Sequence, residues 1–93
     1  MKNKSRVEIH YCPDCHWLPR SAWMAQELLH TFNDELAEVA LLPASEDGRF
    51  EIRLGGVSIW ERKRDGGFPD IKTLKQKVRD AVAPDRRLGH IDK

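Results

Sequence analysis

The chain has 93 residues, enough for a single domain with one modest hydrophobic core. Hydrophobic residues make up 40% of the sequence and charged residues 33%, which excludes a disordered chain and is typical of a folded globular domain. The net charge of +1 gives no long-range attraction to nucleic acid or to an acidic membrane surface, so we expect neither as a partner.

The start of the chain carries no recognisable targeting signal. Residues 1–6 are polar and basic, but no apolar stretch of signal-peptide length follows them. The longest clearly apolar run, residues 39–42, is too short to span a bilayer. We therefore expect a cytoplasmic protein, in a reducing compartment where two cysteines indicate redox chemistry or metal binding rather than a structural disulfide.

The first half of the chain predicts a strand, a helix and a second strand. Val7, Ile9 and Tyr11 alternate with polar residues, as in a strand with one buried face. The strand leads into residues 12–15, Cys-Pro-Asp-Cys, and Pro19 then suits the first turn of a helix. The apolar stripe of this helix is Ala22, Ala25, Leu28, Leu29 and Phe32. Residues 37–42 are almost continuously apolar, which predicts a central parallel strand buried on both faces.

The second half predicts a hairpin and a final helix. Residues 50–54 alternate in polarity, and Gly55-Gly56 suits a type I′ turn before a return strand over 57–60. The basic residues 62–64 are interpreted as a solvated strand end. After a loop over 66–69, Asp70 is a good N-cap for a helix that stops at Pro84.

The element order is therefore β-α-β-β-β-α, an α/β fold. A strand, helix and strand of these lengths form a right-handed crossover with parallel strands. Adding the antiparallel hairpin gives a four-stranded mixed sheet with a thioredoxin-like layout. We expect residues 6–83 to form this domain, with polar tails at 1–5 and 84–93.

Cys12 and Cys15 are the candidate catalytic residues. Their C-x-x-C spacing allows a disulfide within a short loop, and the pair lies between a predicted strand and a predicted helix. The N-terminus of a helix stabilises an anion such as a thiolate, and lowers the pKa of a cysteine placed there. His16 and Arg20 could add positive charge, so both are candidates for tuning the thiolate.

Two cofactor hypotheses compete with redox chemistry. Residues 12–16 also spell C-x-x-C-H, the haem attachment motif, but haem attachment requires export and a mostly helical context, and Met24 is too close along the helix to serve as the opposite ligand. Zinc requires about four ligands, so histidines would have to complete the site: His10, His16, His30 or His90. His10 and His16 lie too close to the cysteines for a standard second pair of ligands. We therefore expect no cofactor and no metal, with Trp17 as a possible hydrophobic contact for a partner protein.

Several short segments together resemble a known family. They are residues 7–15 with both cysteines, residues 48–52 (Gly-Arg-Phe-Glu-Ile), Gly56, Arg62-Lys63, and residues 66–69 (Gly-Gly-Phe-Pro). In order and spacing they resemble the selenoprotein W, T and H family, also called Rdx, over about residues 6–83. The resemblance implies a thioredoxin-like fold, a thiol-based oxidoreductase acting on protein or glutathione disulfides, and a bacterial-type member that uses cysteine throughout. The alternatives are a redox-sensitive binding module without turnover and a small metal-binding protein.

Two arguments conflict about which sulfur attacks. Thioredoxins use the first cysteine, here Cys12, whereas the resemblance places the selenocysteine position at Cys15. The position of Pro19 predicts that the helix begins after the motif, so that the free N–H groups of Arg20, Ser21 and Ala22 point toward Cys15. Pro13 has no N–H to offer Cys12. The sequence therefore favours Cys15 as the attacking thiol and Cys12 as the resolving one.

Overall fold

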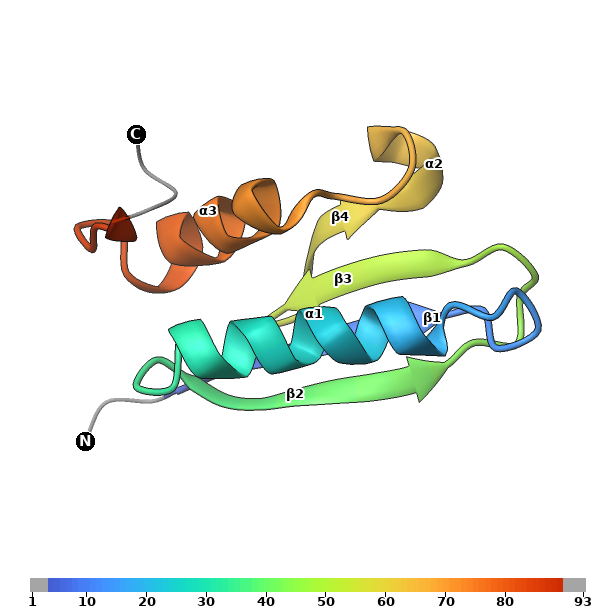
Figure 1. Ribbon diagram of the computed structural model, residues 1–93, viewed down its shortest axis with the longest axis horizontal. Coiled ribbons are helices and arrows are strands. Elements are labelled where there is room, and N and C mark those ends of the chain that lie inside the picture. The colour runs from blue at the N-terminus through green and yellow to red at the C-terminus, as the bar shows by residue number, and fades with distance from the viewer. Residues whose placement is uncertain (1–3, 90–93) are drawn as a thin grey trace.

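The computed structural model describes residues 4–89, which form one mixed four-stranded sheet and three helices. Figure 1 shows the elements in chain order: β1 (Ser5–Tyr11), α1 (Leu18–Thr31), β2 (Leu36–Pro43), β3 (Phe50–Leu54), β4 (Val57–Glu61), α2 (Arg62–Asp65) and α3 (Ile71–Val82). The strand order is β2-β1-β3-β4; β1 pairs parallel with β2 and antiparallel with β3, and β3 pairs antiparallel with β4. The predicted α/β, thioredoxin-like layout is confirmed.

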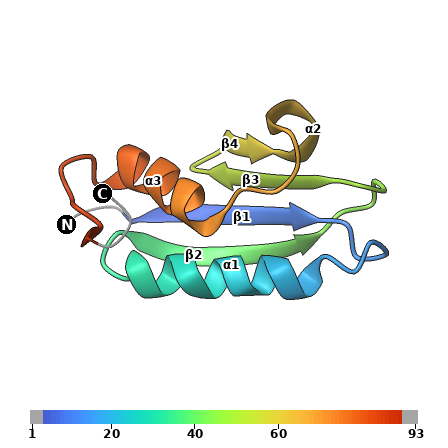
Figure 2. The ribbon, with the colours of Figure 1, turned by 45° about the horizontal axis from the view of Figure 1, so that its top comes forward.

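The two long helices, α1 and α3, lie on the same face of the sheet (Figures 1 and 2). The core fills the space between that face and the helices, and alternate residues of β1 and β3 supply its sheet side, as the period-two pattern predicts. The fully or almost fully buried members are Val7, Ile9, Tyr11, Met24, Ala25, Leu28, Phe32, Leu36, Phe50, Ile52, Leu54, Leu74, Val78 and Leu88.

The opposite face of the sheet carries charged side chains. Arg6 lies 2.7 Å from Glu38 and 3.1 Å from Glu8, so it links β1 to β2. The ring of His10 lies 3.0 Å from the other carboxylate oxygen of Glu8, and hydrogen bonds to His10 and Arg6 lower the pKa of that carboxyl. Such pairs keep this face hydrated, which explains why one helical layer is sufficient to cover the sheet.

Several expectations about local structure are confirmed. Gly55 and Gly56 have φ values of 57° and 83°, as a type I′ turn requires. The carboxylate of Asp70 accepts a hydrogen bond of 2.7 Å from the N–H of Thr73 and caps α3. Pro19 occupies the first turn of α1.

Three expectations are wrong, each because of tertiary context. The strand over 37–42 is not central: β2 lies at the sheet edge, and residues 39–42 are only half-buried. Leu29 is 41% exposed, and the buried stripe of α1 instead includes Met24. The strand end predicted at 62–64 is the short helix α2, because the carboxylate of Glu61 accepts hydrogen bonds from the N–H groups of the second and third residues after it.

The polar segment after α3 returns to the core. Leu88 is 7% exposed and belongs to the hydrophobic cluster. The guanidinium of Arg86 lies 2.9 Å from the carboxylate of Glu35 and 5.5 Å above the ring of Phe32. Part of the segment expected as a polar tail therefore covers one end of the core. The domain limits of 6–83 stay a prediction. His90 lies outside the described residues.

A buried ion pair joins the two helices. The ammonium group of Lys75 on α3 lies 2.9 Å from a carboxylate oxygen of Glu27 on α1. The side chain of Lys75 is only 6% exposed, whereas that of Glu27 is 27% exposed. An ammonium buried to this extent needs a partner, because desolvation without one is costly.

We expect Glu27→Ala to destabilise the fold by about 1–3 kcal/mol, because it leaves the buried ammonium of Lys75 without its carboxylate. The matched control is Glu38→Ala, which removes a carboxylate from an exposed pair and should cost about 0–1 kcal/mol. Urea unfolding of both variants measures the two losses. Equal losses would show that the Lys75 ammonium reaches water despite its burial.

Candidate functional site

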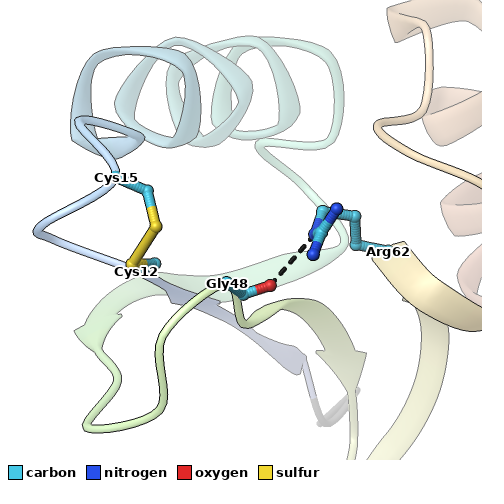
Figure 3. The surroundings of a disulfide bond; sticks show 4 residues. All are labelled: Cys12, Cys15, Gly48 and Arg62. Atoms are coloured by element: carbon cyan, nitrogen blue, oxygen red, sulfur yellow. Dashed lines mark hydrogen bonds between the residues drawn. A yellow bond between two sulfur atoms is a disulfide. The ribbon is translucent and has the colours of Figure 1, made fainter.

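The two cysteines are joined by a disulfide at the end of the central strand. Cys12 directly follows Tyr11, the last residue of β1, and Cys15 lies three residues further, with 5.3 Å between the two Cα atoms. Figure 3 shows the bond connecting the end of the strand to the turn before α1. Cys12 is 1% exposed, whereas Cys15 is partly exposed. The two sulfurs therefore occupy different environments.

The turn that holds Cys15 has an unusual backbone. The N–H of His16 donates to the carbonyl of Pro13 at 3.1 Å and closes the turn. His16 itself has a φ of 62°, the left-handed conformation that residues with a side chain seldom adopt. The chain reverses there with only one residue, Trp17, left before α1 begins.

The start of α1 differs in one respect from the sequence expectation. Ser21, whose N–H was expected to point toward Cys15, donates that N–H to the carbonyl of Trp17 at 3.0 Å. Its hydroxyl donates to the same carbonyl at 2.8 Å, and the residue is fully buried. The N–H of Ser21 is therefore used inside the helix, so it is not free for a thiolate.

The loop between β2 and β3 lies beside the disulfide. The N–H of Ala44 donates to the carbonyl of Tyr11 at 2.7 Å, which continues the parallel pairing up to the motif. Further along, the carbonyl of Gly48 accepts a hydrogen bond of 3.0 Å from Nε of Arg62 (Figure 3). A Cβ at Gly48 would lie 3.2 Å from a terminal nitrogen of Arg62, and the φ of 76° also favours glycine.

Aromatic rings hold the segment 66–69 against the motif. The ring of Phe68 meets the ring of Trp17 edge to face at 4.9 Å and the fully buried ring of Phe50 at 4.8 Å. The indole N–H of Trp60 donates to the carbonyl of Gly67 at 2.9 Å. We call Trp17 and Phe68 the aromatic pair. Trp17 lies two residues after Cys15, and Phe68 lies on the loop that leads to α3.

Two arginines stack on the aromatic pair. The guanidinium carbon of Arg20 lies 4.0 Å from the centre of the Phe68 ring, and that of Arg62 lies 5.2 Å from the centre of the Trp17 ring. Within residues 4–89, no hydrogen bond joins Arg20 or His16 to a cysteine sulfur. Thiolate tuning by these two residues stays a prediction.

The structure places Gly48, Arg62 and Phe68 at the site, in addition to the cysteines and charged residues that the sequence indicated. None of them carries a redox or acid–base signal, so reasoning from residue type passed over them. Their segments nevertheless appear among those that carried the family resemblance, and this was the available signal.

The other candidates lie apart from the disulfide. Met24 is buried in the core at 4% exposure, and His10 contacts Glu8 on the charged face of the sheet. In the described part of the chain, no group of three His, Cys, Asp or Glu side chains is arranged to hold a metal ion. Across residues 4–89, no helix has the length and apolar character needed to cross a membrane.

Comparisons with known proteins identify close relatives. The model of the Rdx family matches residues 6–80. The crystal structure of a selenoprotein W-related protein from Vibrio cholerae is 59% identical, with a TM-score of 0.82 over 85% of this chain and 98% of that one. A crystal structure of a protein from Bordetella parapertussis is 52% identical, with a TM-score of 0.83 over 86% of this chain and 100% of that one. The comparison with curated proteins gives no match.

The left-handed backbone at His16 predicts that glycine at this position gives a more stable protein than a β-branched residue does. We expect His16→Val to be less stable than His16→Gly by about 1–2 kcal/mol, because a β-branched side chain opposes a positive φ. Both variants lose the imidazole, so the difference isolates the backbone. Urea unfolding of the oxidised proteins measures it.

The same two substitutions at His30, within helix α1, provide the control. There glycine should be the less stable of the two, by a few tenths of a kcal/mol. If His16→Val is as stable as His16→Gly, the assigned backbone strain is contradicted.

Proposed function

The chain belongs to the Rdx family, and from this premise we propose that it is a thiol–disulfide oxidoreductase that exchanges electrons with protein or glutathione thiols through Cys12 and Cys15. The observation that carries the proposal is the disulfide itself, formed between a buried and a partly exposed sulfur at the junction of β1 and α1. A purely structural bond across three residues would constrain little chain, because the stabilisation that a disulfide gives grows with the loop it closes.

We assign the attacking role to Cys15. A sulfur must be reached in line by its reaction partner, and Cys15 is the more exposed of the two. Cys12 is almost completely buried, so a second protein or glutathione cannot approach its sulfur without displacing core residues. This order is opposite to that of thioredoxins and agrees with the position that selenocysteine occupies in the family.

The exchange then has two steps. The thiolate of reduced Cys15 attacks one sulfur of a substrate disulfide, forms a mixed disulfide with it and releases the other substrate sulfur as a thiolate. The thiolate of Cys12 next attacks the sulfur of Cys15, which releases the second substrate thiolate and forms the Cys12–Cys15 disulfide. Two electrons pass from the protein dithiol to the substrate, and a low-molecular-weight thiol returns them by the reverse sequence.

The two cysteine variants test the assignment. Reduced Cys12→Ser should form a mixed disulfide with glutathione disulfide that persists, since the resolving thiol is absent. Reduced Cys15→Ser should react at least about tenfold more slowly, because its remaining thiol is buried. Mass spectrometry resolves the adducts over time. Faster reaction of Cys15→Ser than of Cys12→Ser would reverse the roles.

Turnover needs a separate measurement with the wild-type protein. We expect catalytic amounts to accelerate the reduction of bis(2-hydroxyethyl) disulfide by dithiothreitol, and the double variant lacking both thiols to show only the uncatalysed rate. Formation of the mixed disulfide without acceleration would favour a redox-sensitive binding module instead.

A further inference from the structure

Most arginines of this protein fall into two groups. Of the nine arginines, six contact a carboxylate within 3.4 Å: Arg6, Arg49, Arg53, Arg64, Arg79 and Arg86. Arg87 is exposed in the segment after α3, away from the motif in sequence. Arg20 and Arg62 have no carboxylate partner within residues 4–89, and both instead stack on the aromatic pair beside the disulfide. In a chain with 15 acidic residues, these two guanidinium groups keep their charge uncompensated at the site.

Arg62 is held in a fixed orientation. Its Nε donates to the carbonyl of Gly48 at 3.0 Å, and its guanidinium lies over the ring of Trp17. In the described chain the terminal nitrogens of Arg62 have no hydrogen-bond acceptor. Stacking on an aromatic ring leaves the N–H edge of a guanidinium free for a planar anion, and carboxylate is the protein group that fits this edge best.

Arg20 occupies the matching position on the second ring. Its guanidinium lies 4.0 Å from the centre of the Phe68 ring, and the rings of Phe68 and Trp17 touch at 4.9 Å. Each of the two rings of the aromatic pair therefore has its own guanidinium contact, and Trp17 follows the turn that carries Cys15 by two residues.

A polar groove that includes Gly48 is less suited to bind an anion. It has a volume of about 270 Å³ and is lined by Glu46, Asp47, Gly48, Arg49, Glu61 and Lys63. Three of these residues are carboxylates, and Arg49 is already paired with Glu51 at 2.8 Å. With Lys63 as the second cation, the lining has three negative and two positive groups, a net charge of −1. The groove therefore disfavours an anionic group relative to the aromatic pair with its two arginines.

We propose that Arg20 and Arg62 bind a carboxylate that the disulfide substrate carries close to its reacting sulfur. The inference rests on the proposed function and names the class of substrate: a disulfide with an acidic group beside the sulfur. Glutathione has such carboxylates, and so does a protein cysteine flanked by aspartate or glutamate. In this role the arginines position the substrate and take no part in electron transfer.

The test compares an anionic with a neutral reagent at the single thiol of Cys15. In a Cys12→Ser background, the rate with 5,5′-dithiobis(2-nitrobenzoate), which carries carboxylates, is divided by the rate with neutral 4,4′-dithiodipyridine. A change in the pKa of Cys15 affects both rates alike, so it cancels in this ratio. An accessible thiolate attacks the disulfide bond of either reagent, so the ratio is obtained whether or not the protein turns over a substrate.

We expect Arg62→Met and Arg20→Met each to lower the ratio about two- to fivefold at low salt, as loss of one nearby cation predicts. Arg62→Lys should keep most of the ratio, because it retains the charge. The control is Arg64→Met, which removes the same charge from α2 but from a side chain paired with Asp65 at 2.7 Å. Equal ratios in the Arg62→Met, Arg20→Met and Arg64→Met proteins would overturn the proposal.

A second arm identifies the source of the carboxylate. The Cys12→Ser protein is given glutathione disulfide, a peptide disulfide with aspartate beside cysteine, or the same peptide with asparagine. Preference for glutathione disulfide over the asparagine peptide indicates a small thiol, and preference for the aspartate peptide indicates a protein substrate. If neither acidic disulfide reacts faster than the asparagine peptide, the proposal is wrong.

Discussion

The central position of β1 is the constraint on which the site depends. Because β1 pairs with β2 on one side and with β3 on the other, its last residue, Tyr11, is surrounded by sheet and covered by helix. Cys12 directly follows Tyr11 and is buried in the same surroundings. The chain must then turn back over the end of the sheet to start α1, and this turn carries Cys15 outward. The unequal exposure of the two sulfurs is thus a consequence of strand order.

Local patterns in the sequence were sufficient for most of the fold but not for the order of its strands. Alternation in residues 7–11 and 50–54, the glycine pair at 55–56 and the cap at Asp70 all act within a few residues, so the sequence alone predicts them. The apolar run of β2 does not distinguish an edge strand from a central one, because half-burial against α1 also selects apolar residues. The helix α2 was missed because the capping role of Glu61 depends on how the hairpin ends.

The candidate site, too, could be predicted from the sequence only in part. The C-x-x-C pair and its place between strand and helix follow from sequence, since one spacing and two neighbouring elements define them. The aromatic pair does not, because Trp17 and Phe68 are 51 residues apart and meet only when the loop before α3 packs on the motif. Whether Arg20 or Arg62 finds a carboxylate is likewise a property of the folded surface. Composition gives the number of charges but not their pairing.

The two outer strands have a consequence for the behaviour of the protein in concentrated solution. An edge strand offers unpaired backbone groups to which a second chain can add by edge-to-edge pairing, the first step of many aggregates. Here β2 ends in Pro43, which has no N–H, and carries the exposed charge of Glu38. The other edge, β4, is five residues long, and its pairing with β3 shifts register between Ile52 and Arg53. Both edges are thereby protected against growth of the sheet into a neighbouring molecule.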